Sequence, residues 1–261
     1  MKKLLVFLMI TVICFFMISC TEKEETTESE SLPAQESVSE TETEMAYVPV
    51  ELYTVEIKQE TVEGEAYTAN MIYPQVSGYS NAEIEEKVNA LIYSYAKKKM
   101  ETAVANAGSE LGIFYDVDSF NVTYKGEKLI SALCRGSVSA EGSAYTKNFS
   151  FGINIDFERA KLIGFDEIVS YNGFRKDFVD GAFRQTNGYE NLLSETTTND
   201  LISQYDPLYS IYPDFYIKSD NGTEKLGVIT DTIQVLGFVA EFECKITDKK
   251  YMTDYYSGLV D

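Results

Sequence analysis

The chain of 261 residues contains no histidine. Histidine is the commonest acid–base residue in enzymes and a frequent zinc ligand, so its absence excludes Ser-His-Asp catalysis, Cys-His catalysis and histidine-ligated zinc. The sequence also lacks the G-x-S-x-G, P-loop and G-x-G-x-x-G motifs. We therefore expect a protein that is not an enzyme and that uses no metal or cofactor. Chemistry based on paired carboxylates is the catalytic alternative that stays open.

Positive charge is also scarce. Lysine and arginine together number 22 against 42 aspartates and glutamates, which gives a net charge of −20. Nucleic-acid binding depends on basic side chains that neutralise phosphates, so this balance speaks against nucleic acid as a partner. It favours a cationic partner, which an acidic surface attracts over a distance, or no charged partner.

The apolar run near the N-terminus is short. It covers residues 4–18 with one threonine inside it, whereas a membrane-spanning helix needs about 20 apolar residues. Two lysines precede the run, as in a secretory signal, and Ser19-Cys20 follows it. This junction resembles the lipobox of bacterial lipoproteins, in which the cysteine is lipidated and begins the mature chain. The resemblance implies a signal peptide at residues 1–19 and attachment to a lipid membrane through Cys20.

Residues 21–46 hold nine glutamates, one lysine and no aromatic residue. Such a segment cannot bury enough apolar surface to offset the entropy that ordering costs, and its like charges extend it. With Cys20 it forms an expected disordered tether over residues 20–46, which reaches at most ~90 Å. We therefore expect a protein at the bacterial cell membrane, lipid-anchored and facing outside the cytoplasm.

Cysteine is rare, with four in the chain. Cys14 lies in the expected signal peptide and Cys20 takes the lipid, which leaves Cys134 and Cys244. An even number of cysteines in an exported protein is compatible with a disulfide, and each lies on the apolar face of a strand-like segment. A disulfide between Cys134 and Cys244 is one expectation, with Cys244 directed into the core. Two buried free thiols are the alternative.

Two periodic segments of the remaining chain predict its main elements. Apolar residues at helical spacing predict a helix over residues 81–105, introduced by a capping box at Ser80 and Glu83. Strict alternation over residues 148–157 predicts an antiparallel strand whose phenylalanines and isoleucines are buried and whose polar residues face water.

The order of the predicted elements indicates the fold class. Asn221-Gly222, between two strand-like runs, is a strong hairpin signal. Strands dominate, with one long helix early in the domain and a helical region in its middle. We therefore predict an α+β fold, in which helices pack on one face of an antiparallel sheet, as a single mature domain at residues 47–261.

The candidate binding surface is a tyrosine-rich segment at residues 204–216. Tyrosines on loops serve protein or sugar recognition, but they also pack loops onto their own sheet. Both interpretations stay open from the sequence. The four candidate residues are Tyr205, Tyr209, Tyr212 and Tyr216.

Asp116 and Asp118 have the spacing of alternate ligands in a calcium-binding loop. No glycine follows at the required position and no glutamate closes a twelve-residue loop. The pattern therefore favours a solvated edge strand, and we expect no metal site.

Four segments carry a family resemblance: YPQVSGYSNAEIEEKVNALI at 73–92, NFSFGINIDFERAKLIGFDEIV at 148–169, YPDFYIKSDN at 212–221 and GFVAEFECKI at 237–246. They resemble an extracellular domain of unknown function. That domain occurs beside polysaccharide-deacetylase catalytic domains and in an anti-sigma factor that binds lysozyme. The resemblance covers residues 70–255 and departs from the family at TDTIQVLG, which replaces a stretch with tyrosine and proline. It implies the accessory domain alone, without a deacetylase.

These observations lead to one expected function. We expect a membrane-anchored, non-catalytic envelope lipoprotein that binds a protein, cationic and lysozyme-like, or a cell-wall glycan such as peptidoglycan. A carboxylate-dependent cell-wall hydrolase and a purely structural accessory domain are the alternatives.

Replacing Cys20 by serine removes the sulfur that would carry the lipid. We expect Cys20→Ser to move from the membrane fraction to the soluble fraction, or to accumulate as an unprocessed precursor. Cell fractionation with mass spectrometry of the N-terminal peptide measures both. Cys14→Ser is the matched control and should leave attachment unchanged, because that residue is removed with the signal peptide. Wild-type anchoring of Cys20→Ser would contradict the lipoprotein hypothesis.

Overall fold

A computed structural model of the chain describes residues 52–107, 112–190, 192–231, 239–246 and 250–260. These residues belong to one compact unit, Pro49–Asp261. The expected signal peptide, Cys20 and the tether lie outside the described residues. Within the described part, no helix is both long enough and apolar enough to cross a membrane.

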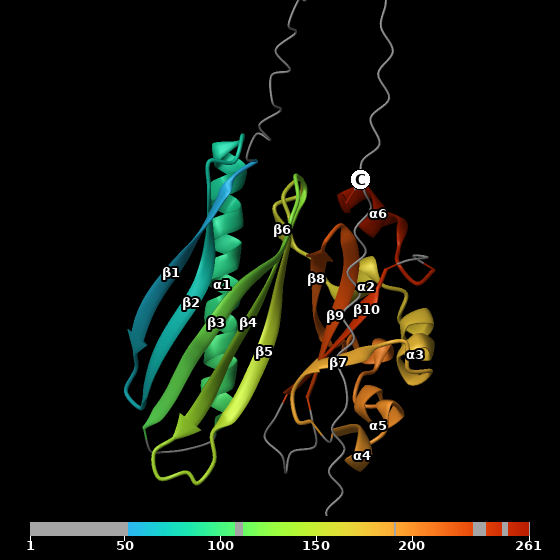
Figure 1. Ribbon diagram of the computed structural model, residues 1–261. Helices are drawn as coiled ribbons and strands as arrows, with labels where there is room; N and C mark the ends of the chain where they lie inside the picture. The colour runs from blue at the N-terminus through green and yellow to red at the C-terminus, as the bar shows by residue number, and fades with distance from the viewer. Residues whose placement is uncertain (1–51, 108–111, 191, 232–238, 247–249, 261) are drawn as a thin grey trace, which may run out of the picture. The chain divides into compact units, whose positions relative to one another are not determined.

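The first sheet has six strands in the order β1-β2-β3-β4-β5-β6 (Figure 1). Neighbouring strands are antiparallel except β2 and β3, which run parallel because the helix α1 connects them as a crossover. The strands are β1 Thr54–Glu63, β2 Tyr67–Ser77, β3 Ile113–Lys125, β4 Leu129–Ala140, β5 Lys147–Asp156 and β6 Lys161–Leu162.

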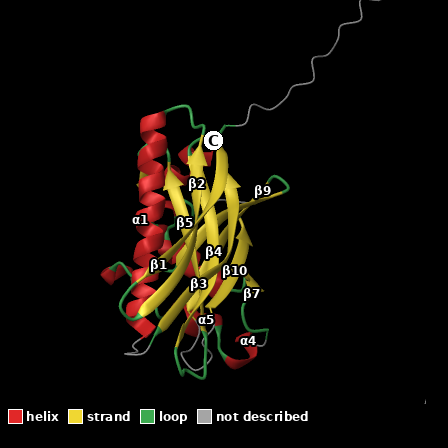
Figure 2. Ribbon diagram, turned by 90° about the vertical axis from the view of Figure 1, so that its left-hand side faces the viewer, coloured by secondary structure: helices red, strands yellow, loops and turns green. Residues whose placement is uncertain are grey.

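Helix α1, Ala82–Ala107, lies along one face of this sheet (Figure 2). It confirms the predicted long helix, but the predicted capping box is wrong. Asn81 caps the helix instead, because its Oδ1 accepts hydrogen bonds from the backbone N–H groups of Glu83 (3.1 Å) and Ile84 (3.2 Å). The face against the sheet buries Val88, Ile92, Ala96 and Met100.

The second sheet has four antiparallel strands in the order β7-β10-β9-β8. Asn221 and Gly222 join β8 to β9 with φ values of 51° and 74°, which confirms the predicted two-residue hairpin. Its strands are β7 Arg184–Asn187, β8 Asp214–Asp220, β9 Thr223–Asp231 and β10 Val239–Lys245.

Short helices complete the domain. They are α2 Phe165–Ile168, α3 Tyr171–Val179, α4 Leu192–Glu195, α5 Thr198–Ile202, the 3-10 helix η1 Pro207–Tyr209 and α6 Asp254–Val260. The second sheet and these helices share a core that includes Phe174, Phe178, Val228 and Phe242. The α+β class is thus confirmed. The sequence predicted one sheet, but the structure has two, and helices pack on each of them.

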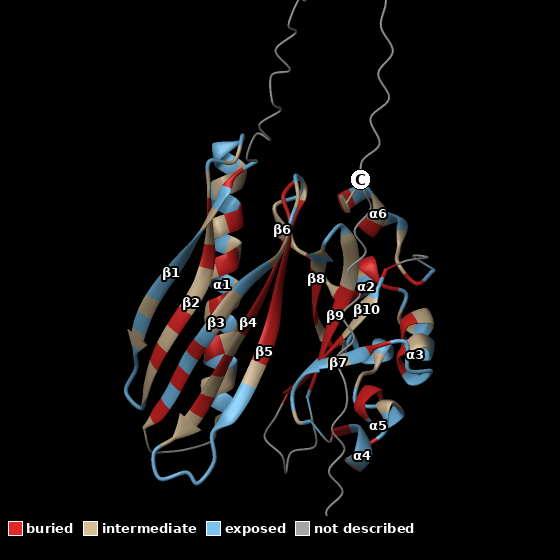
Figure 3. Ribbon diagram, viewed as in Figure 1, coloured by how far each residue is buried: buried red, intermediate tan, exposed pale blue. Residues whose placement is uncertain are grey.

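The polar face of β5 is buried from Ser150 onward, so the prediction that it faces water is wrong there and holds only for the exposed Asn148 (Figure 3). Ser150, Asn154 and Asp156 are 7%, 3% and 1% exposed. The second sheet packs on this face, while the alternate phenylalanines and isoleucines of β5 pack toward α1. The alternation of polar and apolar residues correctly assigned side chains to the two faces of β5. It did not show that the second sheet covers the polar face.

Side chains of the first sheet satisfy the backbone of β8, which is an edge strand of the second. Asn154 Nδ2 donates to the carbonyl oxygen of Phe215 at 2.8 Å. The backbone N–H of Ile217 donates to Ser131 Oγ at 2.9 Å, and Ser131 Oγ contacts Asn154 Oδ1 at 2.7 Å. A Cβ atom on Gly152 would lie 1.7 Å from the Phe215 carbonyl oxygen, so only glycine allows this approach.

A buried carboxylate on β10 forms the charged part of the same contact. Glu241 is 0% exposed and accepts hydrogen bonds from Arg135 Nε (2.7 Å) and Nη2 (2.6 Å) on β4. Ser150 Oγ (2.9 Å) and Asn187 Nδ2 (3.2 Å) also donate to it. Burial acts to raise the pKa of Glu241, but these donors outweigh burial and hold the pKa below its ordinary value of 4.5. We call the five residues Ser131, Arg135, Ser150, Asn154 and Glu241 the polar seam.

Replacing Glu241 by glutamine leaves Arg135 without its carboxylate partner. At pH 7 we expect Glu241→Gln to lower the free energy of unfolding by about 3 kcal/mol, at the low end for a broken buried pair because Arg135 is one-third exposed. The carboxylate stabilises the fold above pH 4.5, and this contribution is lost as the pH falls through the depressed folded pKa. The difference between wild type and variant should therefore shrink in denaturant titrations from pH 7 down to pH 3.

The control for this prediction is Lys176→Ala, which breaks an exposed ion pair with Asp180 on α3. It should leave the unfolding curve close to that of the wild type at each pH. A difference between Glu241→Gln and wild type that is equally large at pH 3 and pH 7 would contradict the role given to the Glu241 charge.

Candidate functional site

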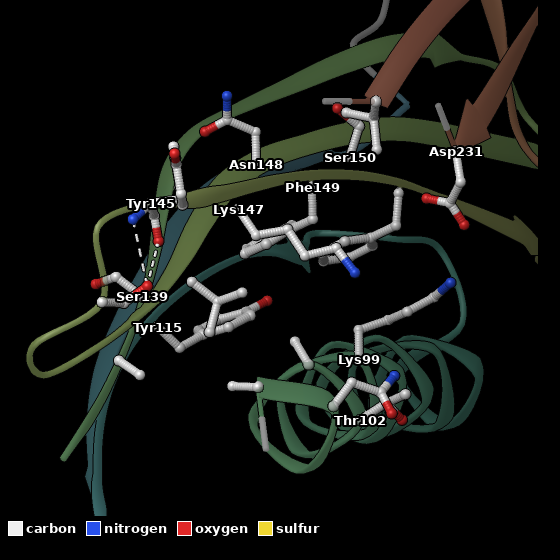
Figure 4. Close-up of a pocket in the computed structure, with 18 of the residues that line it drawn as sticks. Lys99, Thr102, Tyr115, Ser139, Tyr145, Lys147, Asn148, Phe149, Ser150 and Asp231 are labelled. Atoms are coloured by element: carbon white, nitrogen blue, oxygen red, sulfur yellow. Dashed lines mark hydrogen bonds between the residues drawn. The ribbon is translucent and has the colours of Figure 1, made fainter. Parts of the chain in front are cut away.

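A cavity of about 370 Å³ lies between the C-terminal half of α1 and the ends of β5, β8 and β9 (Figure 4). We call it the helix–sheet pocket. Its volume falls within the roughly 300–1,000 Å³ of typical small-ligand sites. The residues that matter most for its chemistry are Lys99, Tyr115, Tyr145, Lys147, Phe149, Asp214 and Asp231.

Aromatic rings form one wall of the pocket. Phe149 and Phe151 alternate along β5 and both face α1, and the Phe149 ring stacks on Tyr115 with centroids 4.7 Å apart and planes at 9°. Phe149 is half-buried, so part of its ring borders the cavity. Tyr145, on the loop between β4 and β5, is 85% exposed. The pocket therefore has packed rings in its wall and one exposed ring at its rim.

An ion pair joins α1 to the start of β8 inside the pocket. Lys99 Nζ lies 2.6 Å from Asp214 Oδ2, and the Tyr95 hydroxyl donates to Asp214 Oδ1 at 3.2 Å. Burial and the Asp214 charge raise the pKa of Tyr95 well above 10, so the phenol stays protonated and keeps donating. The Asp214 carboxylate thus has a charged and a neutral donor within the protein.

Neutral polar groups surround the rings. Thr102 and Asn106 come from α1, Ser139 from β4 and Asn148 from β5. Hydroxyls and amides both donate and accept hydrogen bonds. Together with the rings, they give a pocket that can hold a ligand with apolar faces and hydroxyl-bearing edges.

Two further hollows, of about 490 and 290 Å³, share Arg135. Arg135 is bound to Glu241, so these hollows border the polar seam. Asp118 lines the larger one, and burial together with neighbouring Asp116 raises its pKa. Both aspartates occupy exposed positions of β3, as predicted, although β3 lies inside its sheet and is not an edge. Among the described residues, no group of three or more acidic or cysteine side chains is placed to hold a metal ion.

Most of the tyrosine-rich segment packs against the protein, which is the second of the two interpretations left open by the sequence. Tyr216 is 1% exposed and donates to Glu243 at 2.9 Å, and the Tyr205 hydroxyl donates to the Ile229 carbonyl at 3.3 Å. Tyr212 packs among the rings of the second core. Only Tyr209, which is 76% exposed, faces outward. Packing of Tyr205 and Tyr212 against the core of the second sheet, and burial of Tyr216 within β8, therefore explain three of the four residues.

Cys134 and Cys244 are free thiols, so the expected disulfide is not formed. Cys134 points from β4 toward α1 and is fully buried, which raises the pKa of its thiol to about 12. Cys244 lies on β10 and is partly exposed, packed against the second core. The two residues belong to different sheets, and Cys134 faces away from the second sheet.

The sequence did not single out the residues of the pocket, because they come from α1, the strands β3, β4, β5, β8, β9 and β10, and the loop between β4 and β5. The alternation of β5 predicted that Phe149 faces the core. Tyr145, an aromatic residue in a polar loop between two predicted strands, was the one local signal of an exposed ring. Nothing in the spacing of Lys99 and Asp214 indicated their contact.

No protein-family model and no curated protein matches the sequence. Among solved structures, a member of the DUF3298 family from Bacteroides fragilis is similar with a TM-score of 0.45 and 13% identity, over 79% of this chain and 96% of that chain. A DUF3298 family protein from Pseudomonas aeruginosa is similar with a TM-score of 0.40 and 10% identity, over 68% and 83%. Both neighbours thus belong to one domain family, and likenesses of this size carry no argument about function.

Proposed function

We propose that this protein is a lipid-anchored, non-catalytic envelope lipoprotein whose folded domain binds a cell-wall glycan in the helix–sheet pocket. Cys20 carries the lipid, residues 21–46 form the tether, and the domain faces outside the cytoplasm. The predicted signal peptide, lipobox-like junction and acidic segment support the anchor and the tether. The proposed binding activity rests on the pocket.

The observation that carries the proposal is the combination of an aromatic wall with neutral hydrogen-bonding groups in one cavity. Sugar rings present apolar C–H faces and hydroxyl edges, so they match aromatic rings on one side and amides or hydroxyls on the other. Phe149 supplies the fixed ring and Tyr145 the exposed one. The cavity of about 370 Å³ suits a short saccharide segment.

The hydrogen bonds that Asp214 accepts from Lys99 and Tyr95 support a role in binding rather than in hydrolysis. A carboxylate-dependent glycosidase uses one carboxylic acid to protonate the leaving oxygen and a second carboxylate across the scissile bond. In the pocket, Asp214 is bound by Lys99 and Tyr95, so it is not free to deliver a proton to a ligand. Among the described residues, Asp231 is the other carboxylate that lines the cavity. We therefore assign the pocket to recognition.

Removing the exposed ring at the rim should weaken glycan binding without unfolding the protein. We expect Tyr145→Ala to reduce the affinity of the full-length protein for purified peptidoglycan about two- to tenfold, because a ring contact is worth ~0.5–1.5 kcal/mol. Sedimentation binding assays with insoluble wall material measure the affinity. The matched control is Tyr209→Ala, since Tyr209 is also exposed but lies outside the pocket.

The two tyrosine variants separate the alternatives. If the Tyr209→Ala variant does not bind glycan and the Tyr145→Ala variant binds it as the wild type does, the binding site lies in the tyrosine-rich segment. Release of reducing sugar from the wall by the wild-type protein would favour the hydrolase. Absence of binding by the wild type would favour a purely structural domain.

The charge of the chain supports a second candidate partner, a cationic lysozyme-like protein. With a net charge of −20, the chain attracts a basic protein over a distance, and salt screens this attraction. We expect the full-length protein to retain lysozyme in a pull-down at low salt and to release it as salt rises. Tyr145→Ala should not change this retention. No retention at low salt would exclude this partner.

A further inference from the structure

The helix–sheet pocket contains two oppositely charged side chains, Lys147 and Asp231, for which no ion pair is found within the described residues. Lys147 begins β5 and Asp231 ends β9, and both are exposed. In Figure 4 both side chains point into the helix–sheet pocket, toward the ammonium of Lys99. Neither has an ion-pair partner among the residues that the structure describes, whereas Asp214 neutralises Lys99 at 2.6 Å. The pocket therefore presents one cationic and one anionic group to a ligand.

This pair of charges selects among ligand types. A ligand with a carboxylate alone is attracted by Lys147 but repelled by Asp231, and also by the field of a chain whose net charge is −20. A ligand with an ammonium alone is repelled by Lys147. A ligand that carries both groups gains two attractions and meets no net opposing field. The two contacts also fix its orientation in the pocket.

We propose that the ligand of this pocket is a zwitterionic glycopeptide, a sugar that carries a short peptide with a carboxylate and a free amine. Lys147 binds the carboxylate and Asp231 binds the ammonium. The sugar ring packs against Phe149 and Tyr145, and the peptide crosses the opening between β5 and β9. This inference rests on the proposed glycan-binding function and adds the chemical class of the ligand to it.

Four soluble probes test the charge requirement by isothermal titration calorimetry on the full-length protein. They are a muramyl tripeptide of alanine, isoglutamine and lysine, which carries one carboxylate and one amine, the same molecule with its amine acetylated, the same molecule with its carboxylate amidated, and an uncharged oligomer of N-acetylglucosamine. We expect the unmodified tripeptide to bind most tightly. Each single modification should weaken binding about three- to fivefold, as for the loss of one exposed ion pair.

Two variants assign each charge to its partner. With Lys147→Gln, amidation of the carboxylate should no longer weaken binding, while acetylation of the amine still does. With Asp231→Asn the pattern should reverse. A purely structural role of either residue would weaken all four probes alike. Lys98→Gln is the matched control, because Lys98 is an exposed lysine of α1 outside the pocket, and it should behave as the wild type does.

Three outcomes would contradict the proposals, and each has its own pattern. If the wild type binds the uncharged oligomer as tightly as the tripeptide, and both variants bind as the wild type does, the glycan-binding function stands and the zwitterionic ligand is refuted. If the wild type binds none of the four probes, the glycan-binding function itself is refuted. A crossed pattern in which Lys147→Gln affects the amine and Asp231→Asn the carboxylate would overturn the assigned orientation.

Discussion

The two sheets meet through polar groups, and the rest of the structure depends on this polar seam. The edge strand β8 has backbone N–H and C=O groups that are buried between the two sheets and need hydrogen-bond partners. Asn154 and Ser131 of the first sheet provide these partners. Gly152 leaves the space for this approach. Glu241, fully buried, is held by Arg135. A buried polar group left without a partner costs about 1–3 kcal/mol, so the seam permits one relative position of the sheets and penalises others.

The helix–sheet pocket follows from that fixed position. Strand β5 has buried side chains on both faces of the first sheet. Phe149 and Phe151 face α1, while Ser150 and Asn154 face the second sheet. The seam brings the start of β8 to the first half of β5, beside which Asp214 meets Lys99 of α1. The cavity is therefore assembled by the docking of two sheets that each have their own core. This explains why its lining comes from many parts of the chain.

Much of the secondary structure could be predicted from the sequence, but few of the residues that line the pocket could be. The helix at Ala82–Ala107, the hairpin at Asn221-Gly222 and the alternation of β5 are local patterns, and the structure has all three. The disulfide prediction was wrong and three of the four tyrosines proved to be packed, because exposure and pairing depend on which distant segment covers a residue. Tyr205 and Tyr216 looked available in sequence, yet their hydroxyls bond to Ile229 and Glu243 of the adjoining strands.

The sequence by itself determined the chemical repertoire and the elements: no histidine, an excess of acids, one long amphipathic helix and strands with two distinct faces. Only the tertiary structure decided which polar face is buried and where a cavity forms. The reason is that periodicity is set by neighbouring residues, whereas a polar face is buried only if partners exist elsewhere. For Asn154 that partner lies 61 residues away, and for Arg135 it lies 106 residues away.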